Sequence, residues 1–107
     1  MATTYKFVRG DTLPQLGVTL TRDDGTVVDL TGMTVNLHVR AQGAPSVSFT
    51  KVATIYDATG GEFIVAWNSG DLDLDAGIYE AEIELVDGEN IETVYDLIRL
   101  QIRDDIA

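Results

Sequence analysis

Apolar and polar residues alternate over most of this chain, and residues typical of turns interrupt the alternation at short intervals. Alternation with a period of two places every second side chain on the same face of an extended strand. No stretch keeps apolar residues at the spacing of a helix over three turns. The pattern therefore predicts about seven or eight strands at roughly 8–12-residue intervals, as in a β-sandwich or barrel.

The clearest strands have one apolar and one polar face, and the apolar face is expected to line the core. The predicted inward-facing sets are Leu16, Val18 and Leu20; Val35, Leu37 and Val39; Phe63, Val65 and Trp67; Tyr79, Ala81, Ile83 and Leu85; and Ile98, Leu100 and Ile102. Residues 46–56 form a less regular strand, with Val47 and Phe49 on one face. Lys51 breaks its alternation, which predicts a bulge or a change of sheet nearby.

Several segments are interpreted as connections. Asp-Gly pairs at residues 23–25 and 87–90 predict hairpin turns, because Asp-Gly tolerates the positive φ of a tight turn. The first hairpin is expected to return along a strand at residues 26–30. Residues 68–75 are expected to cross between sheets, with one helical turn capped by Ser69. The short first strand (5–8) and a long last strand (91–103) are the expected sheet edges.

Residues 75–81 read DAGIYEA, the spacing of a tyrosine corner, the turn that leads into strand F of immunoglobulin-type sandwiches. Ala81 stands where such a strand has its disulfide cysteine. In this turn the tyrosine ring packs into the core and its hydroxyl bonds a backbone group. The chain is therefore expected to be an immunoglobulin-like antiparallel β-sandwich, with Asp75, Gly77 and Tyr79 as its structural corner.

Composition is consistent with one such domain. The chain has 107 residues, 45% of them hydrophobic, which is enough for a single core, and residues 1–107 are expected to form one domain. The absence of cysteine excludes disulfides and thiolate metal sites.

A net charge of −11 would repel nucleic acid and anionic lipid surfaces. Residues 1–6 lack the apolar core of a signal peptide, and no apolar run reaches the roughly 20 residues that span a bilayer. Neither a nucleic acid nor a membrane is an expected partner.

A catalytic site is hard to assemble from these residues. The one histidine, His38, lies mid-strand between inward-facing positions and is expected to face solvent. The serines lack a nucleophile elbow, and there is no glycine-rich phosphate loop. The sequence predicts neither catalysis nor a cofactor.

Three aspartates, Asp71, Asp73 and Asp75, alternate, and Glu82 follows Asp71 by eleven residues, which resembles the spacing of an EF-hand calcium loop. However, Ala76 stands where that loop requires glycine, and no amphipathic helix flanks it. The favoured interpretation is a solvated crossover without a metal, and calcium binding at residues 71–75 stays an alternative.

Some apolar side chains fall on positions expected to face water. Tyr95 and Leu97 oppose the inward set of the last strand, and Ile64 opposes Phe63 and Val65. Such positions mark either an interface or a register shifted by one residue. If the face is real, Tyr95, Leu97 and Ile64 are the candidate interface residues, with Tyr95 and Leu97 as the best anchors.

Four motifs occur in a fixed order: RGDTLP (9–14), DLTG (29–32), DAGIY (75–79) and AEI (81–83). As an ordered set they resemble the immunoglobulin-like N-terminal domain family of the baseplate upper protein of tailed bacteriophages, and related small phage tail proteins. The resemblance covers roughly residues 5–103. It implies a β-sandwich that docks a larger protein onto the tail tip, without catalysis.

Members with the baseplate role usually continue into a long C-terminal part, whereas this chain ends soon after residue 103. The resemblance therefore implies a non-enzymatic structural subunit of the tail, neck or baseplate. This subunit would be assembled into the virion in the host cytoplasm, and other virion proteins would be its partners. A capsid decoration protein or a carbohydrate-binding module is the alternative. The second is disfavoured because Trp67 is expected to face inward.

Overall fold

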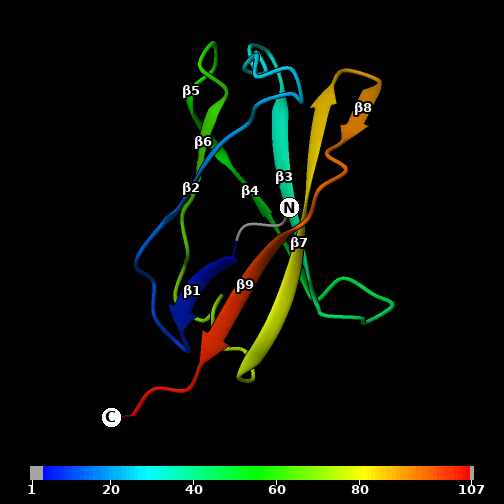
Figure 1. The fold of residues 1–107 in the computed structure, drawn as a ribbon. Helices are drawn as coiled ribbons and strands as arrows, with labels where there is room; N and C mark the ends of the chain where they lie inside the picture. Colours follow the sequence, from blue (N-terminus) through cyan, green and yellow to red (C-terminus); the bar gives the residue numbers. More distant parts are fainter. Residues whose placement is uncertain (1–3, 107) are drawn as a thin grey trace.

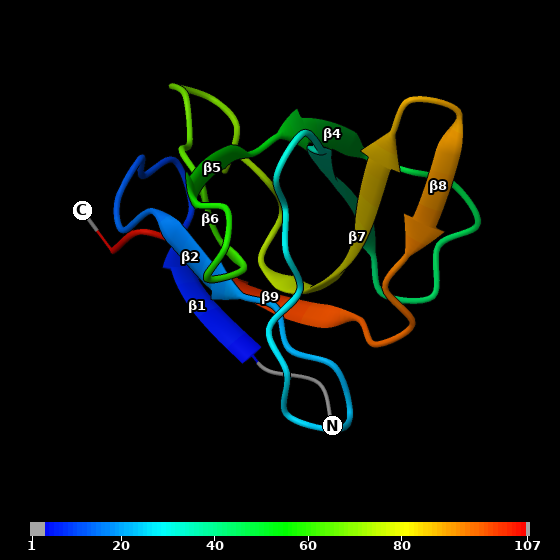
Figure 2. The same ribbon diagram turned by 90° about the horizontal axis from the view of Figure 1, so that it is seen from above.

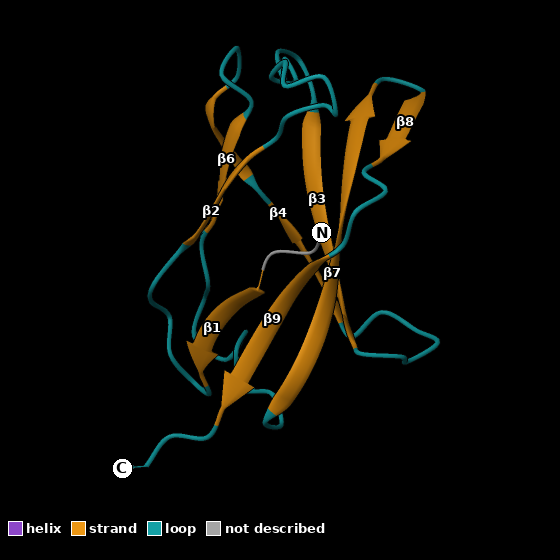
Figure 3. Cartoon of the chain, viewed as in Figure 1, coloured by secondary structure: helices purple, strands orange, loops and turns teal. Residues whose placement is uncertain are grey.

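The computed structural model describes residues 4–106, which form nine strands and no helix (Figures 1 and 3). The strands are β1 (Thr4–Val8), β2 (Leu16–Thr19), β3 (Thr34–Ala41), β4 (Phe49–Val52), β5 (Thr54–Asp57), β6 (Glu62–Val65), β7 (Gly77–Asp87), β8 (Asn90–Thr93) and β9 (Ile98–Arg103). The all-β prediction is confirmed. The number of strands was underestimated, because two runs interpreted as single strands are each divided in two.

The strands form two sheets. The larger has six strands in the order β1-β9-β7-β3-β4, with β8 pairing the far end of β7, and the smaller has the order β2-β6-β5. All pairs are antiparallel except β1 with β9, which run parallel with Tyr5 opposite Leu100. The prediction of an antiparallel fold was wrong for this pair. Figure 2 shows the smaller sheet beside the larger one.

The first division follows the irregularity at Lys51. β4 belongs to the larger sheet and β5 to the smaller one, so the chain changes sheet at Ala53. The Ala53 N–H still donates to the Val35 carbonyl at 2.8 Å, which keeps the crossing chain attached to β3. The predicted change of sheet is confirmed. Val47 is exposed and precedes β4, which begins at the partly buried Phe49, so the prediction that both lie on one face of the same strand was wrong.

The second division separates β8 from β9 at residues 94–97. The Val94 N–H donates to the Ile83 carbonyl at 2.9 Å, so the chain still touches β7 as it passes from one strand to the next. β9 lies between β1 and β7, and the prediction that the last strand is a sheet edge was therefore wrong. β1 is an edge of the larger sheet, as predicted for the first strand.

Buried side chains from both sheets form one hydrophobic cluster, so the sheets pack against each other. All the predicted inward-facing side chains belong to it or, in the case of Val18, pack against it in part. Phe7 of β1, together with Val28, Leu30 and Leu72 outside the strands, completes this core. Alternation therefore identified the core correctly wherever it was regular.

The connections agree with the sequence only in part. The hairpins at residues 23–25 and 87–90 form, the second by direct pairing of β7 with β8. Residues 26–30 form no strand; they make an isolated bridge from Val27 to Thr21 and single backbone hydrogen bonds from Val28 to Leu20 and from Leu30 to Ala58. Residues 68–75 cross between the sheets without a helical turn. There the Asp71 carboxylate, rather than Ser69, accepts from the Asn68 N–H at 2.7 Å.

Candidate functional site: a groove on the outer face of the larger sheet

Tyr79 lies at the beginning of β7, where the chain enters the larger sheet. Its side chain is 8% exposed, and its hydroxyl donates to the Asp75 backbone carbonyl at 2.8 Å. Gly77 between them has a φ of +152°, which side chains rarely adopt. Burial, followed by the Asp75 charge, raises the pKa of Tyr79. The hydroxyl therefore keeps its proton at neutral pH and acts as a structural donor.

Arg9 directly follows β1, and its guanidinium contacts carboxylates in the loop before β7 and in the segment after β9. Its Nε lies 2.9 Å from Asp73 Oδ1, and its Nη1 lies 3.6 Å from carboxylate oxygens of Asp75 and Asp104. The neighbouring Gly10 N–H donates to the Leu72 carbonyl at 3.0 Å. The hydrogen bond that Arg9 donates to Asp73, followed by the charge of Asp73, raises the pKa of Arg9. The end of β1 is thus attached to the loop that precedes β7.

The contacts of Asp71, Asp73 and Asp75 also bear on the alternative that residues 71–75 bind calcium. Asp73 pairs with Arg9, whereas Asp71 Oδ2 accepts from Lys51 Nζ at 2.6 Å. Burial opposes its ionisation, but hydrogen bonds from Lys51 and the Asn68 N–H outweigh it and lower the pKa of this carboxyl. Across residues 4–106 no group of three or more acidic or histidine side chains is placed to hold a metal ion. The aspartates are instead partners of basic side chains.

His38 lies on the outward face of β3, as predicted, within a row of polar contacts. Its Nδ1 lies 2.8 Å from Thr50 Oγ1 and its Nε2 lies 3.4 Å from Glu84 Oε1. Asn36 Nδ2 donates to the same Glu84 oxygen at 3.0 Å. These bonds, with that from Asn36 the stronger, lower the pKa of Glu84. The contacts are typical of a solvated sheet surface, and the hydroxyl beside the imidazole belongs to the exposed Thr50 of β4.

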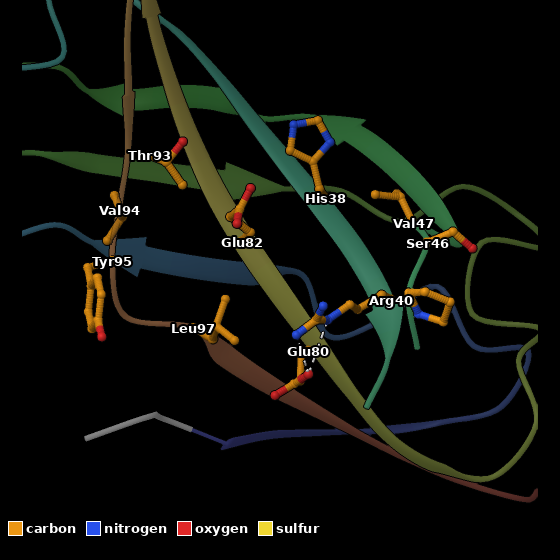
Figure 4. Close-up of a pocket in the computed structure, with 11 residues that line it drawn as sticks. His38, Arg40, Ser46, Val47, Glu80, Glu82, Thr93, Val94, Tyr95 and Leu97 are labelled. Carbon is orange, nitrogen blue, oxygen red and sulfur yellow. Dashed lines mark hydrogen bonds and ion pairs between the residues drawn. The ribbon is translucent and has the colours of Figure 1, made fainter. Parts of the chain in front are cut away.

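A groove with a volume of about 470 Å³ crosses this outer face (Figure 4). Its floor consists of outward side chains of β3 and β7. One wall is the loop after β3 and the other is the link between β8 and β9. The lining residues are His38, Arg40, Pro45, Ser46, Val47, Glu80, Glu82, Thr93, Val94, Tyr95 and Leu97.

The floor of the groove is acidic. Arg40 Nη2 lies 3.0 Å from Glu80 Oε1, so this pair is neutral as a unit. Glu82, one pleat further along β7, is exposed and has no ion pair within the part of the chain that the structure describes. A negative charge therefore remains between two apolar walls.

Two of the three candidate interface residues line this groove. Tyr95 is 95% exposed and Leu97 is half-buried, both in the link between β8 and β9 and not in a strand as predicted. Tyr95 also borders a second hollow of about 460 Å³, so it stands on the ridge between the two. Ile64 lies elsewhere, on the outer face of the smaller sheet, where it pairs with Gly17 and Thr54. The structure brings Tyr95 and Leu97 together but not Ile64.

Sequence reasoning missed the other wall of the groove. Val47 is 55% exposed and follows Pro45 in the loop that joins β3 to β4. The proline at residue 45 marked the loop, but the apolar alternation of Val47 with Phe49 suggested a strand. A signal was available in the polar residues Ser46 and Ser48 on either side of Val47, which are typical of loops as well as strands.

These features define a class: an all-β protein of two packed sheets with a groove on the outer face of the larger sheet, and with no membrane-crossing helix within residues 4–106. Residues 2–106 match the family model of the BppU N-terminal domain, and the chain belongs to this family. The family takes its name from the N-terminal domain of the baseplate upper protein. A comparison with curated proteins found no match. The family assignment confirms the resemblance read from the four motifs. It implies a baseplate component located in the virion and in contact with other virion proteins.

Proposed function

We propose that the chain is a non-enzymatic structural module of a tailed phage particle, which joins the baseplate through protein–protein contacts. The observation that carries this proposal is the family match over nearly the whole chain. Tyr95 and the groove beside it supply a surface of the right kind, because exposed aromatic side chains next to a hollow dominate contact energies.

The proposal includes one immunoglobulin-like domain over residues 1–107. It is supported by the single hydrophobic cluster shared by both sheets and by the hydrogen bond of Tyr79 at the crossover. A rigid module suits a role in which many copies hold partners at fixed positions, since repetition on a symmetric particle multiplies weak contacts.

A carbohydrate-binding module is disfavoured by the position of the aromatic side chains. Trp67 is 5% exposed and packs edge-to-face on Phe7 with ring centroids 5.5 Å apart. Of the two exposed tyrosines within residues 4–106, Tyr56 belongs to β5 of the smaller sheet and Tyr95 to the link between two strands of the larger sheet, so they form no common stacking platform for a sugar. Acrylamide should quench Trp67 fluorescence weakly in the folded protein, and strong quenching would favour the sugar alternative.

The proposed function is tested in purified particles of a phage that encodes this chain. An epitope tag on the chain, detected by immunogold electron microscopy and mass spectrometry, should label the baseplate end of the tail. Label at the neck or on the capsid would assign the module to the alternative virion locations. Particles that lack the chain although the lysate contains it would contradict a structural role.

A further inference from the structure

We propose that the groove between Val47 and Tyr95 binds an extended, basic segment of a partner protein, with a Lys or Arg side chain of that segment beside Glu82. This inference rests on the proposed function and adds to it the docking surface and the chemistry of the partner.

The shape of the groove favours an extended segment. Its floor is made of outward side chains of β3 and β7, and its walls come from the loop after β3 and the link between β8 and β9 (Figure 4). Val47 and Tyr95 are exposed side chains on opposite walls. A strand-like segment presents its side chains alternately to two opposite sides. With a backbone edge over the floor, it could place apolar side chains against Val47 and basic side chains on the side of Tyr95 and Glu82.

Charge selects a basic segment over an acidic one. Glu80 is already neutralised by Arg40 at 3.0 Å, but Glu82 is exposed without an ion pair within residues 4–106. An incoming ammonium or guanidinium group would pair with Glu82 and could lie against the ring of Tyr95, where a cation is attracted by the aromatic face. An acidic segment would meet repulsion from Glu82 and from the net charge of −11.

The neighbouring part of the same sheet has the opposite charge, which would orient the segment. Lys6, Arg99 and Arg103 occupy outward positions of β1 and β9, and none of them has an ion pair to an acidic side chain in the described chain. A partner with its basic residues over β7 and neutral or acidic residues over β9 fits this face in one direction only.

Two synthetic peptides probe the groove directly: acetyl-SVKVRVS-amide and the matched acetyl-SVEVEVS-amide. Titration into the ¹⁵N-labelled chain, followed by NMR, should shift the amide signals of Glu82 and of residues 94–97 with the basic peptide only. Shifts with both peptides, with neither, or at Ile64 and Tyr56 on the smaller sheet would overturn the proposal.

Matched variants make the test specific. Glu82→Lys and Tyr95→Ala should each weaken binding of the basic peptide at least tenfold, because both remove a central contact. Glu89→Lys, at the tip of the β7–β8 hairpin, changes the net charge equally, and Tyr56→Ala removes the exposed tyrosine of the other sheet. Both controls should bind like the wild-type chain, and a loss in either control equal to that in its groove variant would contradict the assignment.

Incorporation into particles separates this inference from the proposed function. Glu82→Lys should lower the amount of chain in purified particles at least tenfold, whereas Glu89→Lys should not. If both variants enter particles as well as the wild-type chain, the structural role stands and the groove assignment fails. If the wild-type chain is itself absent from particles, the proposed function fails. Self-association in sedimentation that Tyr95→Ala abolishes would make a second copy the occupant and overturn the basic-partner assignment.

Discussion

At the scale of single residues, Tyr79 offers a hydrogen bond whose contribution can be measured. Tyr79→Phe removes the donor to the Asp75 carbonyl while keeping the buried ring. The loss should cost about 1 kcal/mol, the usual net value of such a bond, and should lower Tm by roughly 4–8 °C for a chain of this size. Tyr56→Phe is the matched control, because that side chain is 73% exposed. Thermal unfolding with equal Tm for both variants would show that the corner bond contributes nothing.

Gly61 is a second residue at which a small substitution, the addition of one Cβ atom, should lower the stability of the fold. Its φ is +69°, and a Cβ there would lie 2.8 Å from the backbone oxygens of Leu20 and Val28. Backbone cannot move aside as a flexible side chain can, so Gly61→Ala should cost more than about 2 kcal/mol through strain and displacement. Gly17→Ala meets nothing within 4 Å and should cost far less. Urea unfolding of the two variants measures the difference, and similar midpoints would contradict the predicted clash.

At the scale of elements, the two turns on either side of residue 28 contain the same hydrogen-bonded motif, in which an aspartate carboxylate accepts from a threonine two residues later. Asp29 Oδ1 accepts from the Thr31 hydroxyl at 2.6 Å and from the Thr31 N–H at 2.9 Å, and Asp24 does the same with Thr26. The hydroxyl bond, followed by the backbone bond, lowers the pKa of Asp29 below 3.8. A carboxylate with a lowered pKa stabilises the fold above its unfolded pKa, and this stabilisation is lost as the pH falls through the folded value.

Asp29→Asn keeps an acceptor oxygen but removes the charge. The variant should therefore unfold at a lower temperature than the wild-type chain at pH 7, and the gap should close as the pH falls below 3.8. Asp23→Asn, which removes the same charge one turn away, controls for the change in net charge. The check is Tm of all three proteins across the acid range, and a gap that stays constant with pH would contradict the mechanism.

The strands also show where sequence reasoning succeeds. Alternation identified the cores of β3, β6, β7 and β9, because the period of two is a local property of the chain. Alternation predicted a bulge or a change of sheet near Lys51, but it could not decide between the two, since the change of sheet at Ala53 depends on which partner strand is nearest. The parallel pairing of β1 with β9 was missed for the same reason, as the two strands are far apart in sequence.

The candidate site was likewise predicted only in part from the sequence. Tyr95 and Leu97 were found because apolar side chains stood where water was expected, a signal present in the sequence itself. Their partner across the groove, Val47, was missed because a loop conformation and not a periodic pattern places it there. Ile64 carried the same signal as Tyr95 but belongs to the other sheet, and only the topology separates them.

At the scale of the whole molecule, net charge and size together predict a response to salt. The chain measures 41 × 27 × 26 Å and has eighteen acidic against seven basic residues. The Debye length is about 30 Å at 0.01 M salt and about 8 Å at 0.15 M, so repulsion extends across the whole molecule only in the dilute buffer. Screening also weakens the surface ion pairs, but such exposed pairs are worth little.

Repulsion among the excess carboxylates should therefore dominate, and Tm at pH 7 should rise by a few degrees between 0.01 M and 0.15 M sodium chloride. Calorimetry over this range measures the effect, with sodium perchlorate as a check that ionic strength and not the chloride ion is responsible. A falling Tm would mean that local pairs such as Arg9 with Asp73 outweigh the net charge. The acidic surface would then be a set of balanced contacts, and the basic segment expected at Glu82 would lose its long-range attraction.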